Sequence, residues 1–221
     1  ETMAGAIYRK PIAFALMATV AILVGSVVTM AYPMLRADMH PKLEGLKPFS
    51  ALQLAGRDVY QREGCVGCHT QTIRPLQSEV ARYGDYSKAG EFAYDHPFLW
   101  GSRRIGPDLA REGGRYNDLW HVRHMEDPRA VNPKSIMPAY PDLLKDPIAF
   151  GGIQKRVDAM AMLGVPYGDA VNIGEDMART QAREVADQIA SEGGPAGLED
   201  KEIVALVAYL QRLGIDIKQT P

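Results

Sequence analysis

The residues best suited to chemistry lie in one pentapeptide, CVGCH, which runs from Cys65 to His69. It holds the only two cysteines of the chain, separated by two residues and followed at once by a histidine. Two thiols on one short turn can each form a thioether bond to a vinyl group of a haem, and the histidine after them can bind the iron. The motif therefore predicts one covalent haem c, carried by Cys65 and Cys68, with His69 as an axial iron ligand.

Three other uses of the cysteine pair fit the chain less well. A redox-active pair sits on a thioredoxin-like strand-to-helix junction, and the strand–helix–strand pattern of that fold is missing. A zinc site takes four ligands, and no second cysteine pair exists to complete one. A buried disulfide leaves the adjoining His69 unexplained.

The second axial ligand is expected downstream, and Met137 is the best candidate. Pro133, Pro138 and Pro141 bar regular helix and stiffen the loop around it. A stiff loop holds a thioether against iron at little ordering cost, and paired Met and His ligands recur in haem c proteins. Other candidates stay open: Met125, Met160, Met162, Met177, His96, His121 and His124.

Several residues are expected around the haem. Gly106 and Pro107 resemble the turn of class I cytochromes c in which a proline carbonyl accepts the N–H of the iron-binding histidine. Arginines pair well with carboxylates, so two of them become candidates for the haem propionates, although a solvated surface explains them equally well. Three aromatic side chains are expected to wall the pocket, where burial alone would also account for them. The arginines are Arg103 and Arg104, and the aromatic residues are Trp100, Tyr116 and Trp120. His121 and His124, three residues apart on one helix face, are iron or metal ligands or polar residues of a packed surface.

Two helices must position these groups. Apolar residues at helical spacing predict a helix over 51–63, directly before the motif, and an amphipathic helix within 198–214, with acidic residues from Glu199 to Glu202 in its first turn. Gly56 is unfavourable inside a helix, so close approach of another helix is its expected compensation. Crossing of the first and last helices resembles class I cytochromes c, which gives a mainly α haem domain.

An uncharged segment precedes this domain. Residues 11–35 span about 37 Å as a helix, enough to cross a bilayer core of roughly 30 Å. A cleaved signal peptide would have a shorter apolar region followed by a small-residue cleavage site, so a retained single transmembrane helix is favoured. We therefore expect an N-terminal segment over 1–36, a linker over 37–50 and a haem domain over 51–221. The net charge of −2 and the lack of a basic run give no indication of nucleic-acid binding.

Longer strings resemble one family. GRDVYQREGCVGCHTQTIRP, RYGDYSKAGEFAYDHPFLWGSRRIGPDLAREGGRY, WHVRH and IMPAYP closely resemble the mono-haem subunit (subunit II) of cbb3-type cytochrome c oxidases, and LGVPY and ALVAYLQRLG agree. The resemblance covers most of 54–214 and includes an inserted loop region before Gly106. It implies a non-catalytic redox subunit that passes electrons from its haem c to the haem b of the catalytic haem–copper subunit.

The same resemblance implies the surroundings. The partners would be the catalytic subunit, a di-haem cytochrome c subunit and a small membrane subunit, with a soluble cytochrome c or a bc1 complex as electron source. The location would be the bacterial inner membrane. The charges that flank the helix leave its orientation nearly undecided, and the haem motif decides it, because bacteria attach c-type haem on the outer side of that membrane, which puts the haem domain in the periplasm. The resemblance also implies a calcium site at the subunit junction, with Ser102 as a candidate ligand.

Three rival functions remain at this stage. A membrane-anchored mono-haem cytochrome of a nitric oxide reductase would share the anchor, the motif and the methionine loop, but not the inserted loop region. A haem-based gas sensor requires a weakly held sixth iron position. A thiol–disulfide enzyme would carry no haem.

Overall fold

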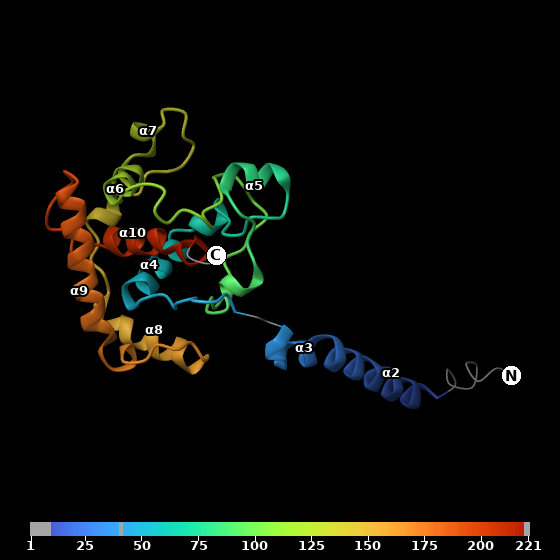
Figure 1. The fold of residues 1–221 in the computed structure, drawn as a ribbon. Coiled ribbons are helices and arrows are strands. Elements are labelled where there is room, and N and C mark those ends of the chain that lie inside the picture. The colour runs from blue at the N-terminus through green and yellow to red at the C-terminus, as the bar shows by residue number, and fades with distance from the viewer. Residues whose placement is uncertain (1–9, 40–41, 219–221) are drawn as a thin grey trace. The chain divides into compact units, whose positions relative to one another are not determined.

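The computed structural model describes residues 10–39 and 42–218, and these form helices and loops without a strand (Figure 1). The mainly α fold class expected from the sequence is confirmed. The chain divides into two compact units, Glu1–Lys42 and Leu43–Pro221. Residues 1–9 of the predicted N-terminal segment, residues 40–41 of the predicted linker and residues 219–221 lie outside the described parts.

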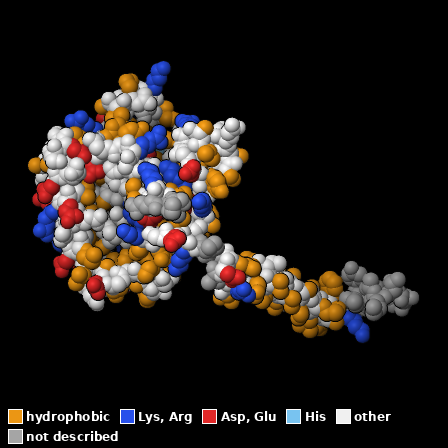
Figure 2. Space-filling view, in the orientation of Figure 1, with side chains coloured by type: hydrophobic (Ala, Val, Ile, Leu, Met, Phe, Trp, Pro, Cys, Tyr) orange, Lys and Arg blue, Asp and Glu red, His pale blue; other side chains and the backbone are white. Residues whose placement is uncertain are grey.

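The first unit contains a continuous apolar helix over Pro11–Leu35, which is long and apolar enough to cross a membrane. It consists of α2 (Pro11–Ser26), one π-helical turn (η1, Val27–Ala31) and α3 (Tyr32–Leu35). The widened turn directly precedes Pro33, whose ring cannot fit against the carbonyl four residues earlier in a regular helix. Figure 2 shows hydrophobic side chains along the surface of this apolar helix, as expected for a helix that faces lipid.

Helix α4 (Ala51–Arg62) begins at a complete capping box. The Ser50 hydroxyl accepts from the backbone N–H of Gln53, whose side chain accepts in return from the Ser50 N–H. Each bond satisfies a donor that the first helical turn leaves free. The predicted helix over 51–63 is thus confirmed to within one residue.

Helix α10 (Glu202–Arg212) is buried along nearly its whole length, from Glu202 to Leu210. A helix that is buried on every side belongs in the centre of a core. The sequence placed its start too early, because Glu199 and Asp200 lie in the turn before the helix and only Glu202 is in its first turn. The backbone bond from the Ile148 N–H to the Asp200 carbonyl, 2.7 Å, holds that turn outside the helix.

Helices α4 and α10 cross with their backbones in contact at Gly56, near the centre of Figure 1. A Cβ placed on Gly56 would lie 1.9 Å from the carbonyl oxygen of Ala205. Only a glycine permits this approach. The expected compensation for Gly56 is therefore present, and its partner is the C-terminal helix that the sequence indicated.

Two further helices form a hairpin that packs against α4. They are α8 (Phe150–Met162) and α9 (Ala170–Ser191), which the sequence prediction missed. Small residues at every fourth position of α9 are buried at this contact: Gly174, Ala178, Ala182 and Ala186. Small side chains let the helices approach closely, so the hairpin supports α4 from the side.

Short elements connect these helices and shape the site. They are η2 (Ala37–Met39), η3 (Cys65–Gly67), α5 (Gln77–Tyr83), η4 (Ala89–Phe92), α6 (Asp118–Glu126), α7 (Pro128–Val131), η5 (Pro141–Leu144) and α11 (Ile215–Lys218).

Candidate functional site

A cavity of about 610 Å³ lies beside the crossing of α4 and α10. Its wall is formed by the end of α4 with η3, the loop over 105–116, helix α6, the loop over 131–140 and the inner face of α10. Most of the lining is apolar, and its volume is in the usual range for ligand pockets. Of the residues singled out in the sequence, the cavity brings together Cys65, Cys68, His69, Pro107, Tyr116, Trp120, His121, His124, Met125 and Met137.

The cysteine turn follows directly from the end of α4. Gly64 adopts a left-handed conformation (φ 72°), which stops the helix and reverses the chain. The N–H of His69 then donates to the carbonyl of Cys65 at 2.8 Å and closes the turn. Both thiols and the His69 ring therefore leave one compact turn and line the same cavity.

The thiols have the chemistry of attachment points rather than of a redox pair. Burial raises the pKa of Cys65 to about 11, and the nearby Glu63 charge adds to the shift. A thiol–disulfide enzyme needs a lowered thiol pKa, because the thiolate is the nucleophile. The electrostatics at Cys65 thus run opposite to those of a disulfide oxidoreductase.

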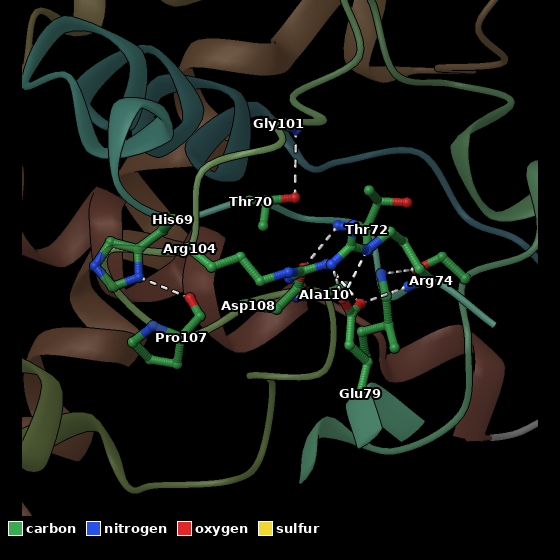
Figure 3. A network of polar contacts seen from close by, with 12 residues as sticks. His69, Thr70, Thr72, Arg74, Glu79, Gly101, Arg104, Pro107, Asp108 and Ala110 are labelled. Atoms are coloured by element: carbon green, nitrogen blue, oxygen red, sulfur yellow. Dashed lines mark hydrogen bonds and ion pairs between the residues drawn. The ribbon is translucent and has the colours of Figure 1, made fainter. Parts of the chain in front are cut away.

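The His69 ring is held by one hydrogen bond. Its Nδ1 lies 2.9 Å from the Pro107 carbonyl oxygen (Figure 3). A carbonyl can only accept, so Nδ1 carries the proton and Nε2 keeps its lone pair. Burial lowers the pKa of His69, opposed by the bond to Pro107 and by Asp108, which favours the neutral ring that a metal requires. The hydrogen bond expected from the Gly106–Pro107 turn is present.

Gly106 makes that hydrogen bond sterically feasible. A Cβ on Gly106 would lie 2.2 Å from Cε1 of the His69 ring, so the backbone runs directly against the imidazole. The Gly106 N–H also donates to the Cys68 carbonyl at 3.1 Å. The two segments are therefore tied together on both sides of His69.

Arg104 joins the segment after His69 to the segment after Gly106, and it does not line the cavity. Its guanidinium donates to Asp108 at 2.6 Å, to Glu79 at 2.6 Å and to the Thr72 carbonyl at 2.9 Å (Figure 3). Asp108 in turn accepts from the Thr72 N–H at 3.1 Å. With its charge matched by two carboxylates, Arg104 is committed to the fold, so the expected propionate contact is not supported.

The loop that carries Met137 is internally braced. The Met137 N–H donates to the Ser135 hydroxyl at 3.2 Å, and the Tyr140 N–H donates to the Met125 carbonyl of α6 at 2.7 Å. Met137 is half-buried against the core and lines the cavity. Its loop is separate from the one that carries His69, which suits a second ligand from another segment.

The structure narrows the other candidates for the second ligand. His96, Met160, Met162 and Met177 do not line the cavity, and Met162 is 83% exposed. Met125, His121 and His124 do line it, all from α6. Two buried ring nitrogens there, Nε2 of His121 and Nδ1 of His124, have no hydrogen-bond partner among the described residues.

Aromatic rings cover one wall. Tyr116 and Trp120 stack at 3.8 Å between ring centroids, and Trp120 stacks on His124 at 4.6 Å. Trp100 was expected in this wall but does not line the cavity. It stacks on Phe98 at 4.4 Å and is 45% exposed.

Two further expectations find no support in the site. Arg103 is exposed and does not line the cavity. Arg115 and Lys134 do line it, although no motif singled them out. For calcium, no cluster of three or more His, Cys, Asp or Glu side chains occurs within 10–39 and 42–218. Ser102 is exposed.

The cavity fits the group that the motif predicts. A haem c needs two thiols on one turn, a neutral imidazole, a second soft or nitrogen ligand and a largely apolar enclosure. The cavity supplies each of these. Cationic Arg115 and Lys134 at its wall suit carboxylates.

A comparison with protein families now places the chain. The family model described as cytochrome c oxidase, mono-heme subunit/FixO, matches residues 5–217.

The chain belongs to this family. As a FixO protein it is a mono-haem cytochrome c subunit of a cbb3-type cytochrome oxidase complex, with one haem and a candidate membrane anchor at Pro11–Leu35. This assignment confirms the resemblance drawn from the sequence and disfavours a nitric oxide reductase subunit. A search of curated proteins finds no match for the chain.

Proposed function

We propose that this FixO protein carries electrons through one haem c towards the haem b of the catalytic haem–copper subunit. Cys65 and Cys68 hold the haem through thioether bonds, and His69 and Met137 bind its iron. The observation that carries the proposal is the His69 ring, fixed by Pro107 with Nε2 free, in a cavity that both thiols and Met137 share. Electrons come from a di-haem subunit or from a soluble cytochrome c.

The protein groups explain why this centre would transfer electrons and leave oxygen chemistry to another subunit. Haem c supplies reversible one-electron chemistry. With both His69 and Met137 bound to the iron, no position would be left for a gas to bind. The thioether of Met137 is a soft ligand that favours the reduced iron and so raises the potential. The bond from His69 Nδ1 to Pro107 fixes the ring and increases its strength as a ligand.

The anchor supports the same role. A helix over Pro11–Leu35 that crosses the inner membrane keeps the haem domain near its acceptor and replaces free diffusion with a high effective concentration. Covalent haem c attachment on the outer side of that membrane would place Leu43–Pro221 in the periplasm. The small membrane subunit and the di-haem subunit are the other expected neighbours.

The rival functions are addressed by particular observations. The raised pKa of Cys65 disfavours a thiol–disulfide enzyme. A gas sensor needs a weakly held sixth position, whereas the Met137 loop is braced by hydrogen bonds and by three prolines. The thioether is thus expected to stay in place.

The test uses the full chain, produced in a bacterium that attaches haem c and purified in mild detergent. We expect haem staining on a denaturing gel and a low-spin absorption spectrum with the weak band of sulfur-to-iron coordination. Cys65→Ser should lose much of the stain. Met137→Leu should keep the stain, lose the sulfur band and lower the potential, because the soft ligand is gone. Met162→Leu, at an exposed methionine outside the cavity, serves as the control.

Each part of the proposal has its own contrary result. Full haem incorporation in Cys65→Ser counts against two thioether bonds. An unchanged sulfur band in Met137→Leu makes the ligand assignment wrong and directs attention to Met125, the other methionine that lines the cavity. Carbon monoxide binding by the reduced wild-type chain at neutral pH favours the sensor. Copurification of a copper-containing partner supports the oxidase, and its absence from a native membrane preparation contradicts it.

A further inference from the structure

Glu112 is a buried acid at the wall of the cavity. It is 6% exposed and lines the cavity within the loop over 105–116. Its backbone N–H donates to the Leu109 carbonyl at 3.1 Å, which fixes the residue in a turn. No ion pair or side-chain hydrogen bond of Glu112 is found in the described part of the chain. Its carboxyl oxygens are not among the fully buried side-chain atoms that lack a partner in the described residues, so the carboxyl group is accessible from the cavity that Glu112 lines.

Two positive charges act on Glu112 without pairing with it. Arg115 lies over the ring of Tyr116, with 5.6 Å from its guanidinium carbon to the ring centroid. Lys218 of α11 donates from Nζ to the Gly113 carbonyl at 2.6 Å. Burial raises the pKa of Glu112 to about 7, and Arg115 and Lys218 hold that pKa down. The carboxyl therefore titrates in the neutral range.

Other titratable or charged groups also line the cavity around Glu112. Those from other elements are Tyr60 of α4, the cysteine-turn residues Cys65, Cys68 and His69, His121 and His124 of α6, and Lys134 and Tyr140 of the Met137 loop. Burial lowers the pKa of both α6 histidines, and the two rings also repel each other's charge at His121, so both are neutral near pH 7. Glu112 is thus the cavity's buried acid whose charge can change near neutrality.

We propose that Glu112 is a proton-binding site coupled to the redox state of the haem in this cavity. The inference rests on the proposed function. When one electron from a reduced donor protein converts Fe(III) to Fe(II), the Glu112 carboxylate takes up one proton from water and forms an O–H bond. When the electron leaves for the acceptor, that bond breaks and the proton returns to water.

The size of the coupling follows from Coulomb's law. A cavity of this volume is roughly 10 Å wide, and one added charge at that distance, at an effective dielectric constant of about 20, changes a proton affinity by about tenfold. Linkage is reciprocal, so the electron affinity changes by the same factor. A tenfold change corresponds to about 59 mV for a one-electron couple.

The sign is fixed by the charge. An electron adds negative charge and so raises the proton affinity of Glu112 in the reduced protein. The midpoint potential is constant at low pH, where Glu112 is protonated in both redox states. It falls by up to about 59 mV as pH rises through the neutral range, and is constant again above it.

The test is an optical redox titration of the haem-loaded full chain in detergent between about pH 5 and pH 9. Glu112→Gln has nearly the same shape and stays neutral. We expect its potential to match the low-pH value of the wild type and to lose the neutral-range fall. Glu199→Gln, at an exposed acid outside the cavity, should keep the wild-type curve. Lys218→Gln removes a positive charge, so it should move the fall to higher pH.

The outcomes separate this inference from the proposed function. A chain without covalent haem overturns the proposed function before any potential is measured. A haem-loaded Glu112→Gln that keeps the wild-type fall overturns the inference alone and assigns the fall to another group, such as the haem propionates. Should Glu112→Gln fail to fold, Lys218→Gln decides: a fall at unchanged pH overturns the inference.

Discussion

Replacing Gly56 by alanine tests the crossing that holds the site together. The new Cβ would lie 1.9 Å from the Ala205 carbonyl oxygen, 2.5 Å from its carbonyl carbon and 2.8 Å from the Tyr209 Cβ. The first two contacts are backbone, which no side-chain rotation relieves. Ordinary contact begins at 3.4 Å, so α4 and α10 must separate by about 1.5 Å along that direction.

That separation has a calculable cost. A gap of 0.5–1 Å already forfeits a quarter to a half of a dispersion contact, and the separated faces carry fully buried side chains such as Leu52 and Leu206. Overpacking typically costs about 1–3 kcal/mol, and we expect the upper end or more. Alanine recovers about 1 kcal/mol of helix propensity. The net destabilisation is about 2–3 kcal/mol, or a fall of about 4–12 °C in Tm.

The assay is thermal unfolding of the full chain in detergent, followed by far-ultraviolet circular dichroism. Gly152→Ala in α8 is the matched control, because its Cβ would meet nothing within 4 Å. It should leave Tm unchanged or raise it slightly. A Gly56→Ala protein that melts within about 2 °C of the wild type would refute the reasoning. So would a Gly152→Ala protein that loses as much stability.

Two further predictions concern the cavity wall. Gly106→Ala should displace the His69 ring from Pro107 and lower the free energy of unfolding by about 1–3 kcal/mol. The haem should stay attached, but its low-spin spectrum should weaken. Gly101→Ala, with its nearest contact at 3.7 Å, is the control, and an unchanged spectrum in Gly106→Ala would contradict the prediction. His121, whose pKa is lowered to about 4 chiefly by burial, binds a proton more readily when unfolded, so stability should decline as pH falls from about 6.5 to about 4. In urea unfolding, His121→Gln should remove up to about 3 kcal/mol of that decline, and an identical pH profile would show that another group causes it.

The parts that sequence predicted well have strong local signals. Apolar residues at helical spacing located α4, directly before the cysteine motif. Gly56 indicated a close neighbour because a glycine inside a helix needs compensation. Pro107 was expected to accept from His69, because Gly106 and Pro107 resemble the turn of class I cytochromes c that holds the iron-binding histidine. Each of these features is decided by a few residues.

The parts that sequence missed depend on distant partners. Arg104 and Arg103 have the same sequence context, and only the fold places Glu79 and Asp108 around Arg104 alone. Trp100 was expected in the cavity, but outside it Trp100 stacks on Phe98 and meets the Phe92 ring edge to face.

Helix α9 and the burial of Glu112 were both missed, but only α9 had a recognisable pattern in the sequence. The four-residue spacing of Gly174, Ala178, Ala182 and Ala186 was a readable sign of α9 packing. Glu112 gave none, since a buried acid and a surface acid look alike in sequence. Which acid is buried is decided by tertiary packing.

The two faces that meet at Gly56 and Ala205 are 149 positions apart in the chain. During synthesis, the segment with both cysteines therefore emerges before the helix that will enclose it. Until α10 is present, the wall that Leu206 and Leu210 give to the cavity is missing, and the cysteine turn lacks that cover. The order of the chain thus favours maturation before folding is complete.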